Sequence, residues 1–152
     1  MSLGEKLGYV HYSDEQSTIR EYFADPDESN ADRQLGSIST TGYLEDSGGI
    51  SIYEVNDGTG YALVPNQRAT KSHIYKREGE PGNPHNHMEV KAVNVSTNNS
   101  DGSEITNVPV NSKFPAGLFV AMSDDKTFQY YSWAEIAGND LVIAPNGVKQ
   151  AK

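Results

Sequence analysis

The stretch Gly49-Ile50-Ser51-Ile52-Tyr53-Glu54-Val55-Asn56-Asp57-Gly58-Thr59-Gly60-Tyr61 decides the fold class of this chain. Its first half alternates with a period of two, which is typical of a β-strand whose two faces meet different surroundings. The Asp57-Gly58 pair follows directly and favours the positive φ angles of a tight hairpin turn. The stretch therefore predicts strands at 50–55 and 61–65, joined by a hairpin at residues 56–60.

Similar short segments continue on both sides of this hairpin. Runs rich in Tyr, Val, Ile and Phe lie between Gly, Asn, Asp and Pro, and a second hairpin is expected at residues 123–127. A single helical turn at 132–138, ended by Gly138, is the strongest helix signal. The strands predicted from these patterns are 9–13, 18–23, 50–55, 61–65, 72–77, 90–95, 117–122, 128–133 and 141–144.

The four strands between residues 50 and 95 are expected to form one antiparallel sheet of the size of a propeller blade. The chain is therefore predicted to be all-β. The periodicity alone leaves a sandwich, a barrel and a propeller open as architectures.

The composition limits the classes of function. The 152 residues are expected to form a single unit over 1–152, and a formal charge of −9 argues against binding to nucleic acid. No apolar run approaches the ~20 residues that cross a bilayer, so a membrane partner is not expected. The chain has no cysteine, which removes disulfides, cysteine-bound zinc and thiol catalysis. It also lacks the Gly-x-Ser-x-Gly elbow that would support a serine triad.

Acidic residues recur where the predicted strands meet loops. Carboxylates brought together at one end of a β structure would suit Ca²⁺, which takes six to eight oxygen ligands. Taken singly, each of these residues is more simply a turn or surface residue, since Asp is common in turns. The acidic residues concerned are Asp14, Glu15, Glu45, Asp46, Asp101, Asp124 and Asp125.

The histidines give a weaker signal. His85 and His87 stand two residues apart in Asn83-Pro84-His85-Asn86-His87, but no cysteine or third histidine lies nearby in the sequence. Because a zinc site needs three or four ligands, and Pro and Asn mark a loop, we interpret this segment as a solvated loop. His11 and His73 lie inside predicted strands, where we expect packing or surface roles.

Nine segments of the chain occur in the order found in a known family. They are Gly8-Tyr9-Val10-His11-Tyr12-Ser13-Asp14-Glu15, Ile19-Arg20-Glu21-Tyr22-Phe23-Ala24-Asp25-Pro26-Asp27, Gly49-Ile50-Ser51-Ile52-Tyr53, Asp57-Gly58-Thr59-Gly60-Tyr61, Asn66-Gln67, Ile74-Tyr75-Lys76-Arg77-Glu78-Gly79, Ser100-Asp101-Gly102, Phe114-Pro115-Ala116-Gly117-Leu118-Phe119-Val120-Ala121 and Trp133-Ala134-Glu135-Ile136-Ala137. Through them, residues 8–138 resemble the C-terminal portion of the β-propeller phytases.

The resemblance implies a fold, an activity and a location. It implies a six-bladed propeller, of which this chain would hold about two and a half to three blades of antiparallel four-stranded sheet. It also implies calcium-dependent phosphate ester hydrolysis of the 3-phytase type, with myo-inositol hexakisphosphate (phytate) or another phosphate ester as substrate. Members of the family are mostly exported, so a secreted or periplasmic location is expected.

The resemblance further implies site residues. Glu15 matches a glutamate that binds metal or phosphate, and Gln67 matches a glutamine that lines the site, so both are predicted to be catalytic. Glu15, Asp46 and Asp101 are the predicted Ca²⁺ ligands. The chain departs from the family at Gly48, where a glutamate is expected, and this change removes one carboxylate from the calcium site.

Two further hypotheses remain open. A non-catalytic propeller module, used for assembly or ligand binding, would explain the partial metal site, and a sugar-binding β-sandwich would also fit tyrosine-rich strands. A partial propeller leaves sheet faces uncovered, so we expect a homo-oligomer or association with the missing propeller half. The apolar residues expected at that interface are Val10, Tyr12, Leu118 and Val120.

Overall fold

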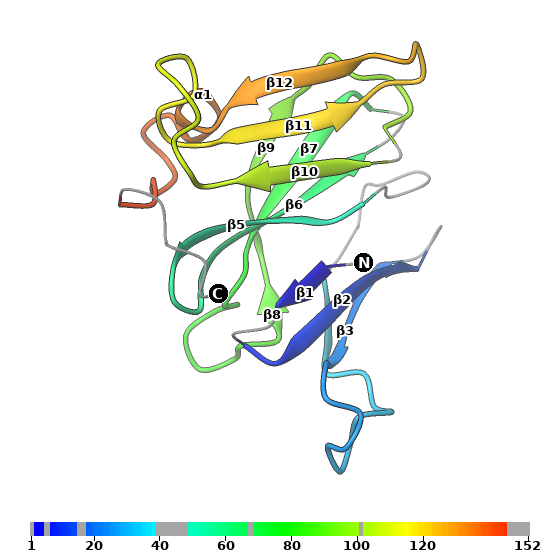
Figure 1. The fold of residues 1–152 in the computed structure, drawn as a ribbon. Helices are drawn as coiled ribbons and strands as arrows, with labels where there is room; N and C mark the ends of the chain where they lie inside the picture. The colour runs from blue at the N-terminus through cyan, green and yellow to red at the C-terminus, as the bar shows by residue number, and fades with distance from the viewer. Residues whose placement is uncertain are drawn as a thin grey trace.

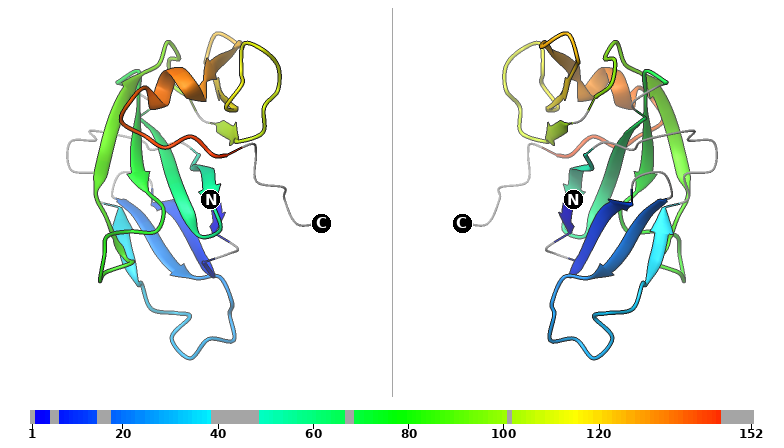
Figure 2. Two further views of the ribbon diagram at one scale, coloured as in Figure 1. Left: turned by 90° about the vertical axis from the view of Figure 1, so that its left-hand side faces the viewer. Right: turned by 90° about the vertical axis from the view of Figure 1, so that its right-hand side faces the viewer.

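The computed structural model describes residues 2–4, 7–14, 18–38, 49–66, 69–100 and 102–145, and within these ranges the strands form three separate sheets. In Figure 1 the second sheet lies between the first sheet, at the bottom, and the third sheet, at the top, and the side views in Figure 2 show the same order. None of the three closes into a barrel within the described ranges. The predicted all-β class is therefore confirmed.

The first sheet contains five strands in the order β1-β2-β3-β4-β8. Its members are β1 (Ser2–Gly4), β2 (Tyr9–Asp14), β3 (Thr18–Phe23), β4 (Gly36–Ile38) and β8 (Asn86–His87). Strands β1 to β4 pair antiparallel, whereas β8 pairs parallel to β4. β8 comes from the connection between two strands of the second sheet, so the chain crosses to the first sheet and returns.

The second sheet is the antiparallel sheet predicted from residues 50–95, in the order β5-β6-β7-β9. Its strands are β5 (Ser51–Asn56), β6 (Thr59–Asn66), β7 (Lys71–Lys76) and β9 (Glu89–Asn94). The hairpin between β5 and β6 closes where Asn56 pairs with Thr59, and Gly58 has a φ of 86° there. The predicted hairpin at residues 56–60 is thereby confirmed.

The third sheet pairs three antiparallel strands, and a short helix follows it. The elements are β10 (Ser103–Thr106), β11 (Leu118–Met122), β12 (Phe128–Ser132) and α1 (Trp133–Ala137). The turn predicted at residues 123–127 joins β11 to β12, and the predicted helical turn ends at Gly138, whose φ is 57°. No helix in the described ranges is long and apolar enough to cross a membrane.

The second sheet is buried on both faces. Along β6, Tyr61 and Leu63 belong to a cluster with the third sheet and α1, whereas Ala62 and Val64 belong to a cluster with the first sheet. Because side chains alternate between the two faces of a strand, β6 contributes to both cores. This explains why the strand reads as a nearly continuous apolar run.

The predicted strand at 141–144 is wrong. Leu141 and Ala144 are buried, but the segment pairs with no strand in the described part of the chain. Its backbone is held instead by tyrosine hydroxyls, because the Val142 amide donates to Tyr61 at 2.9 Å and the Ala144 amide donates to Tyr53 at 3.1 Å. Side chains thus replace the hydrogen bonds of a neighbouring strand.

Candidate functional site

The four residues predicted for the catalytic and metal site all lie outside the described ranges. They are Glu15, Asp46, Gln67 and Asp101. Gly48, the position where the family carries a glutamate, lies outside them as well. Their placement therefore stays a prediction, and only the residues that border them can be described.

The bordering residues are brought together in space. The Thr18 hydroxyl, next to residues 15–17, donates to the Ile38 carbonyl at 2.8 Å, next to residues 39–48. The hydroxyls of Ser51 and Ser103 lie 3.4 Å apart and join the start of β5 to the start of β10. The residues after segment 15–17 and before segment 39–48 are thus in contact, and so are those that follow segment 39–48 and residue 101.

A small apolar core supports this region. Buried Ile19 and Ile38 of the first sheet pack in one cluster with Ile50, Ala62 and Val64 of the second sheet. β6 ends two residues beyond Val64, at Asn66, directly before the predicted Gln67. Residues that lie close in sequence to Glu15, Asp46 and Gln67 therefore pack in one core.

A second polar group lies within the described part of the chain, on the inner face of the first sheet. Glu21 of β3 is fully buried and stands opposite His11 of β2 in the strand register. The crossing segment around β8 adds His85 and His87 to the same carboxylate. Four residues from three parts of the chain therefore meet here, with His11, Glu21 and His87 buried and His85 partly exposed.

The distances separate one short contact from two longer ones. His85 Nδ1 lies 2.9 Å from Glu21 Oε2, within hydrogen-bond range. His11 Nε2 lies 3.5 Å from Glu21 Oε1, and His87 Nε2 lies 3.5 Å from Glu21 Oε2. These two contacts exceed the roughly 2.7–2.9 Å typical of charged hydrogen bonds. Within the described part of the chain, the contact with His85 is thus the shortest of the three histidine contacts with this carboxylate.

The backbone fixes the orientation of His87. Its Nδ1 lies 2.9 Å from the Lys76 carbonyl, and because a carbonyl oxygen only accepts, Nδ1 carries a proton. In a neutral ring, Nε2 then presents a lone pair toward Glu21. The ring also lies 5.5 Å from that of His11 at 80°, an edge-on contact.

The electrostatics favour an ionised carboxylate. Burial acts to raise the pKa of Glu21, but the interactions with His11 and His87 outweigh it and lower the pKa to about 2. Burial acts to lower the pKa of His87, but contacts with Glu21 and the Lys76 carbonyl outweigh it, so the pKa is raised. The Glu21 carboxylate thus carries a negative charge that a nearby proton or cation must balance.

This site corrects the prediction that residues 83–87 form a solvated loop. Asn83 and Pro84 are exposed as expected, but His87 is 5% exposed, because β8 joins the first sheet. His11, for which a packing or surface role was expected, is 4% exposed and faces the Glu21 carboxylate. One signal was present in the sequence: Glu21 stands on the same strand face as buried Ile19, where a carboxylate requires a partner.

Three sheets of mainly antiparallel strands and clustered Glu and His side chains define an all-β protein with groups suited to metal ions. A model of the phytase family matches residues 2–139, and the chain belongs to this family. The resemblance found in the sequence is thereby confirmed.

A curated relative supports the same assignment. The chain is similar to a 3-phytase of Bacillus subtilis (strain 168), with 22% identity over 143 residues. The match covers 88% of this chain and 37% of that protein. The chain therefore spans well under half the length of its relative.

Proposed function

We propose that the chain is part of a calcium-dependent phosphomonoesterase of the 3-phytase type, with phytate as substrate. The observation that carries the proposal is the family match over residues 2–139, to which the similarity with a 3-phytase adds. The resemblance also supports a secreted or periplasmic location.

The three sheets are proposed to be successive blades of a six-bladed propeller. The second sheet is buried against the first on one face and against the third on the other, as an internal blade requires. A complete propeller needs further blades, from a longer chain or from another copy. This agrees with a match that covers 37% of the relative.

Glu15, Asp46 and Asp101 are proposed as calcium ligands, with Glu15 and Gln67 contacting phosphate. Carboxylates from separate loops suit Ca²⁺, and the contacts of Thr18 with Ile38 and of Ser51 with Ser103, which join the borders of those loops in pairs, support a shared site. Bound calcium would neutralise the substrate and lower the pKa of a water ligand.

Phosphate release from phytate, with and without EDTA, tests the activity. We expect release that depends on added Ca²⁺ and falls in Asp46→Ala, because a ligand carboxylate is lost. Gly48→Glu should strengthen calcium binding in calorimetry, since it restores a carboxylate. Unchanged calcium affinity in a folded Gly48→Glu variant would refute the assignment of this position.

We further propose that the outer faces of the first and third sheets take part in assembly. Leu118 and Val120 alternate with buried Phe119 along β11, and Val10 and Tyr12 alternate with buried His11 along β2, so these four residues lie on the uncovered faces. A homo-oligomer or the missing propeller half would cover them.

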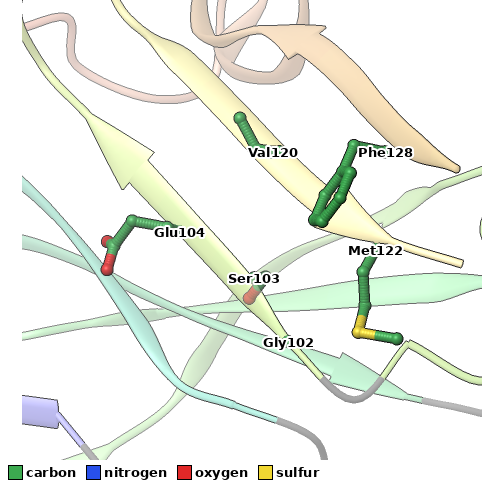
Figure 3. A pocket seen from close by; sticks show the side chains of 6 residues that line it. All are labelled: Gly102, Ser103, Glu104, Val120, Met122 and Phe128. Atoms are coloured by element: carbon green, nitrogen blue, oxygen red, sulfur yellow. The ribbon is translucent and has the colours of Figure 1, made fainter. Parts of the chain in front are cut away.

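A pocket marks the uncovered face of the third sheet. Figure 3 shows Val120, Met122 and Phe128 side by side on β11 and β12. Together with Gly102, Ser103 and Glu104 they line a pocket of about 240 Å³. Phe128 is 62% exposed, which is unusual for a large aromatic residue and fits a surface that another blade covers.

A non-catalytic propeller module is the second candidate. It is favoured by Gly48 in place of the family glutamate and by the 37% coverage of the relative. In that case the chain would assemble and bind calcium weakly without releasing phosphate. The assay with and without EDTA separates the two functions.

A further inference from the structure

The buried cluster of the first sheet contains three polar atoms that lack a hydrogen-bond partner within the described ranges. They are His11 Nε2, Glu21 Oε1 and His87 Nε2. The residues are 4%, 0% and 5% exposed, so water cannot readily satisfy them. Buried polar atoms are almost always paired in native proteins, and an unpaired set that converges calls for an explanation.

We propose that His11, Glu21 and His87 bind one divalent transition-metal ion, with Zn²⁺ as the best match, at a site that joins β2, β3 and β8. This site is separate from the proposed calcium site and does not depend on the proposed phytase activity. The ion supplies the positive charge that the buried carboxylate requires.

The spacing of the atoms fits a metal better than direct hydrogen bonds. The donor atoms of the three residues all lie within 4.8 Å of one another. His11 Nε2 lies 3.5 Å from Glu21 Oε1 and His87 Nε2 lies 3.5 Å from Glu21 Oε2, so the carboxylate would offer both of its oxygens to the ion. Two ligands at about 2.0–2.1 Å from a tetrahedral zinc ion are separated by about 3.4 Å. The two distances thus match neighbouring ligands around one ion.

The surroundings of the three residues match the outer shell of a metal site. A metal-binding histidine usually donates its other ring N–H to a carbonyl or carboxylate, as His87 does to the Lys76 carbonyl. His85 donates to Glu21 and orients the carboxylate. Gly36 permits this approach, because a Cβ there would lie 2.5 Å from the His85 carbonyl.

The ligand set selects the kind of ion. Imidazole nitrogen suits zinc and other late first-row metals, whereas Ca²⁺ takes oxygen ligands. Since the three ligands are buried, the ion would have a structural role. It would fix the two-residue strand β8 to the β2–β3 hairpin, and so add to the backbone pairing through β4 and to the contact between His85 and Glu21.

The test uses the whole 152-residue chain, freed of any histidine tag and stripped with EDTA. Titration calorimetry with ZnCl₂ should give one ion per chain with a dissociation constant at or below about 1 µM. A hundredfold molar excess of Ca²⁺ over the chain should leave this binding unchanged. Zinc should also raise the midpoint of thermal unfolding.

His87→Ala is the test variant and His73→Ala is the matched control. His73 is also a partly buried histidine beside a carboxylate, 2.7 Å from Glu89, but it lies in the second sheet. We expect His87→Ala to weaken zinc binding by at least about 100-fold, because a direct ligand is lost, and His73→Ala to leave it unchanged. Equal zinc affinity in the folded His87→Ala variant would overturn the proposal.

Cobalt substitution keeps the proposal testable if His87→Ala fails to fold. One equivalent of Co²⁺ added to the stripped wild-type chain should produce the intense visible absorption of a four-coordinate ion, and Zn²⁺ should abolish it. A chain that gains neither this absorption nor thermal stability from the metals carries a proton-linked Glu–His cluster instead, and the inference is then wrong.

Discussion

Replacing Tyr53 by Phe removes one buried oxygen atom that joins three parts of the protein. The Tyr53 hydroxyl donates to the Ala116 carbonyl at 2.8 Å and accepts from the Ala144 amide at 3.1 Å. Burial raises the pKa of Tyr53, so the hydroxyl stays protonated and remains a donor. The ring itself is fully buried and stacks on Trp133 with centroids 4.0 Å apart.

The expected cost follows from the two groups left behind. Ala116 and Ala144 are 7% and 6% exposed, so neither backbone group gains easy access to water. An unsatisfied buried group costs about 1–3 kcal/mol, and some relaxation is expected, so Tyr53→Phe should destabilise the fold by about 2–4 kcal/mol. The apolar packing of the ring is unchanged in this variant.

Tyr61→Phe is the matched control. Its hydroxyl accepts a single bond at 2.9 Å, from the amide of Val142, which is 55% exposed and can turn to water. We expect a cost of about 0.5–1.5 kcal/mol. Urea unfolding, followed by far-ultraviolet circular dichroism, measures the free energy of unfolding of both variants. The two values can be compared if the dependence of this free energy on urea concentration is the same in both. Equal losses in the two variants would refute this account of residues 141–144.

Three further variants test other parts of the structure. Gly36→Ala should cost about 1–3 kcal/mol in urea unfolding and weaken zinc binding, because the added Cβ meets the His85 carbonyl; unchanged values would contradict the close packing there. Glu54→Ala should cost about 3 kcal/mol in the same assay, since Arg77 is 3% exposed and donates to Glu54 at 2.9 Å; a neutral result would mean that water reaches the guanidinium. Phe128→Ser should lower the sedimentation mass at micromolar concentration if the third sheet forms the interface, and a stable 16.6 kDa wild-type monomer would contradict assembly.

The parts of the fold that the sequence predicted are those with local signals. The alternation from Ile50 to Val55 and the Asp57-Gly58 turn are contained in a dozen residues, and the observed β5–β6 hairpin follows them. The helical turn before Gly138 is equally local. The sequence did not predict β4 and β8, at one edge of the first sheet. They contain three and two residues, which are too few to show the alternation of a strand.

The buried cluster shows where sequence reasoning ends. Pro84 and Asn86 carry real loop signals, and β8 is buried only because it adds to a strand formed by residues far earlier in the chain. The contact between His85 and Glu21 spans 64 positions, and no spacing rule predicts it. The opposition of His11 and Glu21 was open to prediction, since the two predicted strands form a hairpin whose register pairs them.

The assignment at 141–144 failed for a related reason. Leu141, Val142 and Ile143 form an apolar run, but the two tyrosines that bind the backbone of this segment lie 81 and 91 positions before the residues they contact. The four predicted site residues remain predictions for another reason, because their identities came from a family resemblance rather than from packing. Their loops carry no apolar periodicity that could position them.

The parallel pairing of β8 with β4 has a consequence for synthesis on the ribosome. Ile38 finds its partner His87 only about 50 residues later, which at about 5–20 residues per second takes about 2.5 to 10 seconds. During that interval the nascent chain exposes an open strand edge and the Glu21 carboxylate has not met His85 or His87. The first sheet is thus complete only after residues 86–87 have been synthesised. By then β5, β6 and β7 of the second sheet have already emerged.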